Sequence, residues 1–320
     1  MNAVPPRAWS WKEFEGHTDA IETCALDTPG IDPFCSAPDW MFAAHRAWDN
    51  NLSPWIWRLE SGYAAFLTDG FILTPFDRTW GYSCPLIGPP RVAYELAELL
   101  KRNQGDWGLV VITGIRREAP LFRAIIAAFS SYCEFALGEP QLRWNADLRG
   151  YLDRRPSKFK RELRRIEKKA EKAGITIENG EGRDVFERVL SVESRSWKGP
   201  AETGLNEEPM RDFYRALFRR LIARHRLRLR FARKDGEDIG YIAGGVIGDQ
   251  YRGLQFSFDD RFREFSPGNL MQWSEIQALS QRGYRGYDLG IDIPYKERWA
   301  DERVETSTLV IRRRARPVTP

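Results

Sequence analysis

One stretch, Gln250 to Trp299, restricts the possible folds of this 320-residue chain more than any other. Its segment Tyr251–Phe258 is aromatic-rich and alternates as a strand does, and a Ser-Pro-Gly-Asn turn at 266–269 then leads into a helical run that ends at Gly283. A second strand, Gly286–Ile291, completes the unit. The stretch therefore predicts the order strand, loop, helix, strand, with the loop at the N-terminus of the helix.

The loop before this helix has the composition of an anion site. Ser266 is a preferred N-cap residue and Pro267 suits the first helical position, so the amides of the next turn are expected to face the loop. Two arginines just upstream, Arg261 and Arg263, can pair with a pyrophosphate that these amides hold. If the two strands are neighbours, the second one brings four more polar residues close to the loop: Asp288, Asp292, Tyr295 and Lys296.

Length and composition are typical of one large domain or two average ones, and 42% apolar residues are enough for a sizeable core. The four cysteines form no CxxC pair and the three histidines are isolated, so we expect reduced thiols and no metal site. The N-terminus lacks a signal pattern, and no apolar run approaches the ~20 residues that cross a bilayer. We therefore expect a cytoplasmic protein without a membrane span.

Positive charge is concentrated in one segment. Between Arg149 and Lys172 eleven Lys or Arg stand against four Asp or Glu, a local charge of +7 in a chain whose total is +4. A helix is predicted from Ser157, as its cap, to Gly174, with an apolar stripe on one side. Its outer face is either an ordinary solvated surface or a site for the 3′-phosphate of CoA, a tRNA or an acidic peptide. Aromatic residues do not interleave with the charges, so base stacking is not indicated.

Both halves of the chain repeat one rhythm of strands, a turn, then helix and strand, which indicates a mixed α/β protein. In the first half a helix opens at Pro38 and three short strands lie within Pro54–Phe76. We expect two related subdomains, residues 1–145 and 146–320. Only Pro85–Pro90 stands where the first half should have a phosphate loop. We therefore expect the second half alone to bind a nucleotide-bearing donor, and the first to serve as scaffold and acceptor wall.

From about Ala146 onward the chain resembles the GNAT acyltransferase superfamily, in the branch of BioF2-like and CelD-like proteins that is related to the Fem aminoacyl transferases. One departure is that Ser266 and Pro267 occupy the first small position and the middle position of the usual pyrophosphate loop. The motifs that carry the resemblance are SKFKRELRR at 157–165, Ser196-Trp197, Ser266-Pro-Gly268, Asp288-Leu-Gly290, and Tyr295-Lys296 followed by Trp299.

The resemblance implies a GNAT-like fold, here expected as two tandem subdomains, and transfer of an acyl group from acyl-CoA or an acyl-carrier protein to an amine. In this superfamily the pantetheine arm lies along a strand edge that is splayed open beside the phosphate loop. Here that strand segment is Gln255–Phe258, whose backbone would hold the arm. The donor-binding residues implied are Gln255, Phe256, Ser257, Arg261, Arg263, Ser266, Gly268 and Asn269.

For the chemistry, the resemblance implies Tyr295 as the acid that protonates the leaving thiolate, and a phenol of pKa ~10 is matched to that group. Lys296 would stabilise an oxyanion or bind an acceptor carboxylate, although the pair also fits a packed tyrosine under a surface lysine. Asp288 and Asp292 are the candidate bases, with Asp259 and Asp260 behind them at the end of the preceding strand, and Asp292 is also placed near the substrate. Asp288 equally fits the cap of a turn before Gly290. The acceptor pocket is assigned to Glu193 and Trp197, whose alternative is a place in the core.

Direct attack of the amine is favoured, because no cysteine lies in the Gln250–Trp299 stretch and no Ser-His pair is evident. Two other functions stay open. One is a Fem-like transferase that takes an aminoacyl group from charged tRNA, as the basic helix and the two-subdomain plan would allow. The other is a non-catalytic accessory protein of polysaccharide or envelope biosynthesis.

Overall fold

The computed structural model describes residues 6–48, 51–102, 107–182, 184–196 and 204–314. They divide into two compact units. Unit 1 holds the residues up to Leu142 and those from Glu305 onward, and unit 2 is Arg143–Val304. The expected division at residue 145 left the C-terminal segment in the second subdomain. Here most of the last strand, β14 (Glu302–Arg313), belongs to unit 1, because it pairs antiparallel with two strands of that unit.

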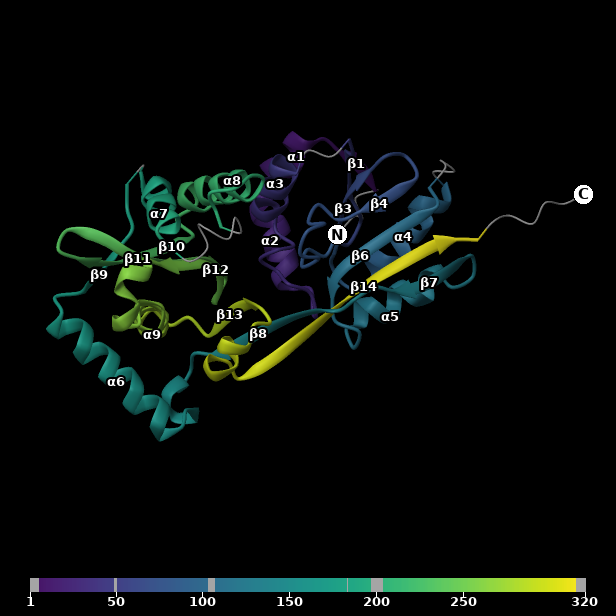
Figure 1. Cartoon of the computed structure of the whole chain (residues 1–320). Helices are drawn as coiled ribbons and strands as arrows, with labels where there is room; N and C mark the ends of the chain where they lie inside the picture. Colours follow the sequence, from purple (N-terminus) through teal and green to yellow (C-terminus); the bar gives the residue numbers. More distant parts are fainter. Residues whose placement is uncertain (1–5, 49–50, 103–106, 183, 197–203, 315–320) are drawn as a thin grey trace, which may run out of the picture. The chain divides into compact units, whose positions relative to one another are not determined.

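Unit 1 is a mixed sheet with helices (Figure 1), and its strands run in the order β1-β2-β3-β4-β6-β14, with β5 on β3 and β7 on β14. The three strands expected within Pro54–Phe76 and the helix expected from Pro38 are confirmed. Its elements are β1 (Arg7–Trp9), α1 (Trp11–Gly16), α2 (Thr18–Leu26), α3 (Pro38–Ala47), β2 (Ser53–Arg58), β3 (Tyr63–Thr68), β4 (Ile72–Thr74), β5 (Leu86–Ile87), α4 (Arg91–Arg102), β6 (Leu109–Ile115), α5 (Pro120–Phe129) and β7 (Cys133–Leu137).

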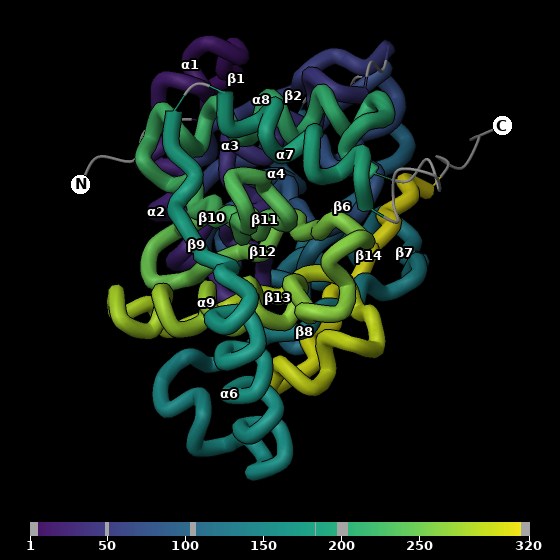
Figure 2. The backbone as a smooth tube through the Cα atoms, turned by 60° about the vertical axis from the view of Figure 1, so that its left-hand side comes forward, coloured from purple at the N-terminus to yellow at the C-terminus, as the bar shows by residue number. Residues whose placement is uncertain are grey.

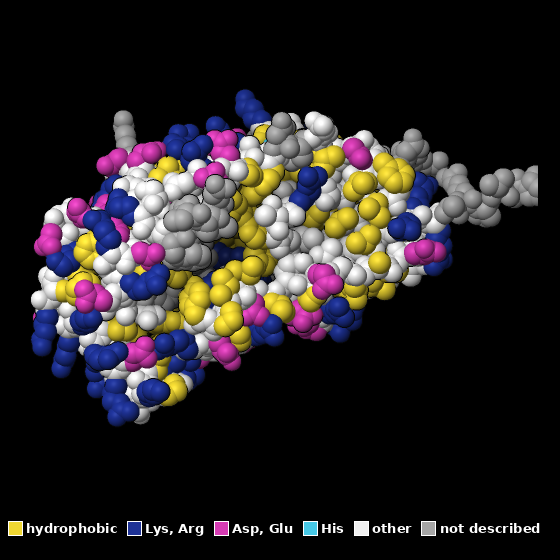
Figure 3. Space-filling view, in the orientation of Figure 1, with side chains coloured by type: hydrophobic (Ala, Val, Ile, Leu, Met, Phe, Trp, Pro, Cys, Tyr) yellow, Lys and Arg dark blue, Asp and Glu magenta, His cyan; other side chains and the backbone are white. Residues whose placement is uncertain are grey.

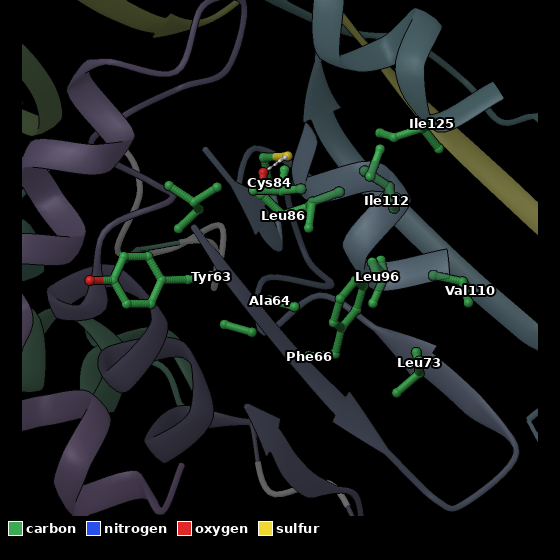
Figure 4. Close-up of a cluster of buried hydrophobic side chains, with 14 of the residues drawn as sticks. Tyr63, Ala64, Phe66, Leu73, Cys84, Leu86, Leu96, Val110, Ile112 and Ile125 are labelled. Atoms are coloured by element: carbon green, nitrogen blue, oxygen red, sulfur yellow. Dashed lines mark hydrogen bonds between the residues drawn. The ribbon is translucent and has the colours of Figure 1, made fainter. Parts of the chain in front are cut away.

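The core of unit 1 forms where side chains of the sheet meet α4 and α5. Figure 4 shows Phe66 from β3, Val110 and Ile112 from β6, and Leu96 from α4 pointing into one apolar cluster. The short strand β5 enters this cluster with Leu86, and its carbonyl accepts a bond from the thiol of Cys84. The core of unit 1 is therefore partly built from the connection between β4 and α4.

Unit 2 contains a second mixed sheet, in the order β8-β13-β12-β11-β10-β9, in which β12 and β13 are parallel and the other neighbours are antiparallel. Its elements are β8 (Gln141–Asp147), the short 3-10 helix η1 (Tyr151–Arg154), α6 (Ser157–Lys172), β9 (Thr176–Asn179), α7 (Val185–Ser194), α8 (Met210–Ala223), β10 (Leu227–Lys234), β11 (Glu237–Ile247), β12 (Gln250–Phe258), η2 (Asp260–Phe265), α9 (Pro267–Gln281), β13 (Gly286–Ile291) and η3 (Pro294–Trp299).

Helices cover both faces of the unit 2 sheet (Figures 1 and 2). The helix α9 packs on one face and α6 lies against α9, whereas α7 and α8 cover the other face. Phe159, Leu163 and Ile166 form the apolar stripe of α6 and are buried on the α9 side. The expected end of this helix is confirmed, because Gly174 has φ +70 and Ile175 N donates to the carbonyl of Ala170.

The predicted cap of α6 is wrong by one position. Pro156 occupies the N-cap and Ser157 is the first helical residue, with no capping bond from its side chain. Within the part of the chain that the structure describes, no helix has both the length and the apolar character to cross a bilayer. The same residues include no group of three or more His, Cys, Asp or Glu that could hold a metal.

Candidate active site

The strands β12 and β13 run side by side for only three residue pairs and then separate. Their parallel ladder ends at Arg252 opposite Asp288. Each strand carries one extra residue beyond that point, Leu254 on β12 against β11, and Leu289 on β13 against β8. An extra residue of this kind bends a strand and sharpens its twist. We call the gap between residues 253–258 of β12 and 289–291 of β13 the fork.

The fork exposes a strip of main chain. Beyond Arg252, β12 keeps its ladder to β11 through Phe258 and has no ladder to another strand among the described residues. In an antiparallel ladder every second residue directs its N–H and C=O groups away from the partner strand. Within 253–258 the N–H and C=O groups of these alternate residues therefore point to the open side of β12. This geometry is the one that the resemblance implied for Gln255–Phe258.

The extra residue at Leu254 also decides which side chains face which helix. Gln255 lies on the side of α8, where its amide donates to the hydroxyl of Tyr214 at 3.1 Å. Phe256 and Phe258 lie on the side of α9 and pack against the core there. Beside the fork, β12 therefore carries two aromatic rings on its α9 face and the Gln255–Tyr214 hydrogen bond on its α8 face.

The N-terminus of α9 lies beside these rings. Pro267 is its first residue, and a Cβ placed on Gly268 would come within 3.2 Å of the Phe256 ring and 3.4 Å of the Phe258 ring. The amides of Gly268 and Asn269 lie in the first turn, where no carbonyl of the helix can accept from them. They are the donors that this helix end can offer to an anion.

The expected side-chain cap at Ser266 is absent. Ser266 stands at the N-cap, but its backbone is left-handed, with φ 53 and ψ 52, and its side chain makes no capping bond. A side-chain cap needs an extended N-cap residue, which the preceding turn of η2 rules out. The backbone carbonyl of Ser266 still accepts from Leu270 N and closes the first turn.

The arginines of the loop are already paired. On η2, Arg261 contacts Asp259 at 2.7 Å and Glu237 at 3.2 Å, and Arg263 contacts Asp260 at 3.0 Å. Burial would raise the pKa of Asp259, but hydrogen bonds, chiefly from Arg261, bring that pKa below its usual value. Local carboxylates thus compensate both guanidiniums, which weakens the clamp expected for a pyrophosphate.

Tyr295 and Lys296 lie at the fork. The Tyr295 ring packs edge-on against that of Phe256, with centroids 5.8 Å apart, and 41% of the residue is exposed. Neighbouring atoms desolvate the hydroxyl and raise the pKa of Tyr295 above its ordinary value, which makes this phenol a weaker acid than a solvated tyrosine. Lys296 Nζ donates to Ile291 O at 3.0 Å. A Cβ built on Gly290 would lie 3.6 Å from Lys296 Nζ and also 3.6 Å from the carbonyl oxygen of Gly253 on β12.

Asp288 is held by two buried arginines. Its Oδ2 accepts from Nη1 of both Arg143 and Arg252, which are 4% and 5% exposed, and its Oδ1 accepts from Gly290 N at 2.7 Å. These contacts engage both carboxylate oxygens within the strands themselves. The contacts therefore favour a structural role, in which Asp288 fixes the point where the strands separate.

Two of the residues assigned to the acceptor have partners within the chain. Asp292 pairs with Arg303, whereas Glu193 is fully buried, where it accepts from the Tyr241 hydroxyl at 3.0 Å and from Leu205 N at 3.3 Å. A buried Glu193 cannot contact an acceptor substrate directly and can act on it only through its partners Tyr241 and Leu205. Trp197 lies outside the described residues.

Several polar residues of this region were missed by the sequence analysis. Tyr214 and Tyr241 belong to segments that look like apolar core, and nothing in the sequence marks their hydroxyls as partners of Gln255 and Glu193. Arg252 does carry a signal, since it is a cation within an otherwise aromatic strand. Its position alone does not identify Asp288 as its partner.

Three comparisons place this geometry among known proteins. Residues 157–297 match the family model described as Acetyltransferase (GNAT) domain. No curated protein matches the chain at the significance required. The likenesses below are all under 25% identity and show a shared fold alone.

Among solved structures, that of FemX has a TM-score of 0.67 at 10% identity, over 95% of this chain and 97% of that one. A conserved protein of unknown function from Bacteroides thetaiotaomicron has 0.63 at 10% identity, over 97% and 100%. The C-terminal domain of a putative lysylphosphatidylglycerol synthetase from Agrobacterium fabrum has 0.57 at 13% identity, over 93% and 92%.

Proposed function

We propose that the chain is an N-acyltransferase that moves an acyl group from a thioester donor to an amine, which the match of residues 157–297 to the GNAT acetyltransferase model supports. The donor is acyl-CoA or an acyl-carrier protein. The observation that carries this proposal is the fork, where the ladder between β12 and β13 ends at Arg252 and Asp288 beside the N-terminus of α9. A thioester arm laid along the open edge finds backbone partners there without displacing any strand.

The donor is held at two places in this proposal. Its pantetheine amides bond to the main chain of Gln255–Ser257, and its phosphate meets the amides of Gly268 and Asn269 at the helix end. Ser266 shapes the turn, and the long-range field of Arg261 and Arg263 adds a smaller attraction because their charges are compensated. Among the described residues no metal cluster contributes to this site.

Transfer then takes one displacement. The amine nitrogen attacks the thioester carbonyl carbon, the C–N bond forms, and the C–S bond breaks with its electron pair going to sulfur. Tyr295 donates its proton to the departing thiolate and is reprotonated from solvent, while Lys296 stabilises the negative charge that develops on the carbonyl oxygen. Because Asp288 is engaged by two arginines, water takes the amine proton.

The acceptor meets the thioester at the fork. Asp292 contributes a carboxylate near the fork, and Glu193 acts from behind by holding Tyr241 and Leu205 in place. The role of Trp197, the role of unit 1 as scaffold and acceptor wall, and a cytoplasmic location stay predictions. An amine on a small molecule or a peptide satisfies this chemistry.

A donor and acceptor panel tests the proposal. Purified protein is incubated with acyl-CoA esters and acyl-carrier proteins of increasing chain length and a library of primary amines, and both the free thiol and the amide product are followed by mass spectrometry. We expect thiol release that depends on the amine. Absence of amide product with every donor, together with no calorimetric binding of any CoA ester or acyl-carrier protein, would contradict the proposal.

A transferase that takes an aminoacyl group from charged tRNA is the second candidate, and the cationic face of α6 favours it. Activity in a cell extract would then be abolished by ribonuclease and restored by added aminoacyl-tRNA. Activity that survives ribonuclease and follows added acyl thioester would exclude this candidate.

A further inference from the structure

The outer face of α6 carries a dense group of cations. Figure 3 shows Lys and Arg side chains gathered at the edge of the molecule where α6 lies. An open groove of about 500 Å³ there is lined by cationic side chains alone. Six exposed residues have no ion pair or hydrogen bond from their side chains among the described residues. They form what we call the α6 face: Lys158, Arg161, Arg164, Arg165, Lys168 and Lys172.

The cations of the α6 face are arranged in a line. Lys158, Arg161, Arg165, Lys168 and Lys172 follow one another at intervals of three or four residues, so they share one side of the helix. At 1.5 Å per residue the line extends over about 21 Å. An acidic helix that carries carboxylates at the same intervals matches this line along its whole length.

The α6 face adjoins the donor loop. Lys169, at its edge, donates through Nζ to Glu264 O at 2.6 Å and lies 5.1 Å from the centre of the Phe265 ring. Both partners belong to η2, the segment that leads into the N-terminus of α9. A partner bound on the α6 face is therefore next to the helix end that faces the fork.

Charge is distributed unevenly between these two places. At the loop, Arg261 and Arg263 are compensated by carboxylates, and the amides of Gly268 and Asn269 suit a single phosphate. The uncompensated cations lie along α6. A donor with one phosphate at the loop and many carboxylates beyond it fits this distribution better than a nucleotide does, because a nucleotide concentrates its charge on a few neighbouring phosphates.

We propose that the α6 face docks an acidic carrier protein, which presents its acyl group on a phosphopantetheine arm to the fork. This inference rests on the proposed function and identifies its donor. The transfer step is unchanged, and the leaving group is the thiol of the carrier's own arm. Single-stranded RNA fits less well, because the one aromatic residue of α6, Phe159, is buried and cannot stack on a base. Duplex RNA binds through its phosphates and needs no stacking, so the test below includes it.

Binding is tested with a purified bacterial acyl carrier protein in its apo, holo and octanoyl forms. The triple variant Arg161→Glu, Arg165→Glu, Lys168→Glu reverses the middle of the line. We expect its Kd for the octanoyl carrier, measured by fluorescence anisotropy at 100 mM salt, to rise at least tenfold, since each charge pair at a rim contributes modestly and reversal adds repulsion. Wild-type affinity should fall steeply between 50 and 300 mM salt.

The matched control reverses three exposed arginines elsewhere, Arg102→Glu, Arg123→Glu and Arg219→Glu, with the same change in net charge. Its Kd should stay within twofold of wild type. A milder triple variant with Gln at the three α6 positions covers the case in which charge reversal disturbs folding, and it should lose affinity to a smaller degree. Equal losses in the control and α6 variants would overturn the proposal.

Two further measurements distinguish a failure of carrier docking from a failure of the proposed function. Octanoyl-phosphopantetheine lacks the carrier, so transfer from it should be the same in wild type and the α6 variant, whereas transfer from the octanoyl carrier should drop. Transfer from the small donor without any binding of the carrier would overturn this inference and leave the proposed function standing. A 20-base-pair RNA duplex that binds more tightly than the carrier and depends on the same three residues would also overturn it.

Discussion

The two units contain the same arrangement, a parallel strand pair joined by a helix, and they use it differently. In unit 2 the pair β12 and β13 separates and its edge stays open. In unit 1 the pair β4 and β6 also meets at only two positions, but β5 pairs with β3 beside it, Ala65 N donates to Pro85 O at 2.8 Å, and Thr113 donates to Ser83 O at 2.6 Å. In unit 1 residues 83–87 therefore occupy the place that corresponds to the open edge of β12 in unit 2.

The glycines at these places show the same difference. Gly114 on β6 has φ +65, and a Cβ there would come within 2.1 Å of the carbonyl oxygen of Tyr82, so two main chains are in contact. Gly268 in unit 2 faces the edges of aromatic rings at ordinary or slightly tight distances. Among the described residues, the connection between the parallel strands covers the place where they separate in unit 1, and the corresponding strand edge in unit 2 has no strand paired to it.

The largest effect that tests this comparison is expected at Tyr295. Tyr295→Phe removes the proposed acid without changing packing, and losing a positioned proton donor typically lowers turnover by about 10²- to 10⁴-fold. Steady-state kinetics with an acyl thioester and amine measures kcat. The control Tyr94→Phe changes a comparably exposed tyrosine of unit 1 and should leave kcat unaltered. Equal rates for Tyr295→Phe and wild type would remove Tyr295 from the chemistry.

Asp288→Asn is expected to act on stability. It leaves Arg143 and Arg252 buried beside a neutral amide, and removing one partner of a buried ion pair costs about 3 kcal/mol or more of unfolding free energy. Guanidinium denaturation of unit 2, followed by tryptophan fluorescence, measures this loss. If stability were unchanged while kcat collapsed, Asp288 would be the base that the sequence suggested.

A pH effect of intermediate size is expected from Glu275 on α9. Burial raises the pKa of Glu275 from 4.5 to about 7, with nearby arginines, Arg230 foremost, opposing the shift. The folded protein therefore holds this proton more tightly than the unfolded chain does. The resulting contribution to the free energy of unfolding is full below about pH 4.5 and is lost as the pH rises to about 7. The loss amounts to about 3 kcal/mol.

Glu275→Gln should flatten this part of the stability profile. Unfolding free energies of wild type and variant at pH 5 and pH 7.5 measure it, and taking the difference between the two proteins cancels other groups, such as the buried Asp77 of unit 1, whose pKa burial also raises. Parallel profiles for the two proteins would show that Glu275 does not titrate in this range.

The smallest effect is expected at the helix end. Gly268→Ala puts a methyl group against Phe256 and Phe258 and should raise KM for the thioester donor severalfold with little change in kcat, because it disturbs binding more than transfer. Gly16→Ala in unit 1 is the matched control, since a Cβ there meets nothing within 4 Å. A variant with unaltered KM would place the donor phosphate elsewhere.

Local patterns were enough to predict the elements that form the site. Alternation identified β12, the turn residues marked both ends of α9, and β13 was predicted from Gly286 to Ile291 as the structure has it. These features depend on a few neighbouring residues. The opened edge at Gln255–Phe258 was expected only through the resemblance, since nothing local announces it.

What could not be predicted depends on residues far apart in the chain. The pairing of Arg143 with Asp288, the burial of Glu193 under Tyr241, and the filling of unit 1 by β5 arise only when strands pair across the sheet. The conformation of Ser266 is a local exception, because its left-handed backbone follows from the turn of η2 and overrides its preference as a cap.

The central claim is that the open edge of β12 in unit 2 holds the donor. A crystal structure with a stable thioether analogue of octanoyl-phosphopantetheine, the arm that CoA and the carrier share, tests it most directly. We expect the pantetheine arm to bond to the main chain of Gln255–Ser257, with its phosphate at Gly268 and Asn269 and its sulfur near Tyr295. Density for the analogue in unit 1, or a structure in which the β12 edge stays without ligand at saturating analogue, would contradict it.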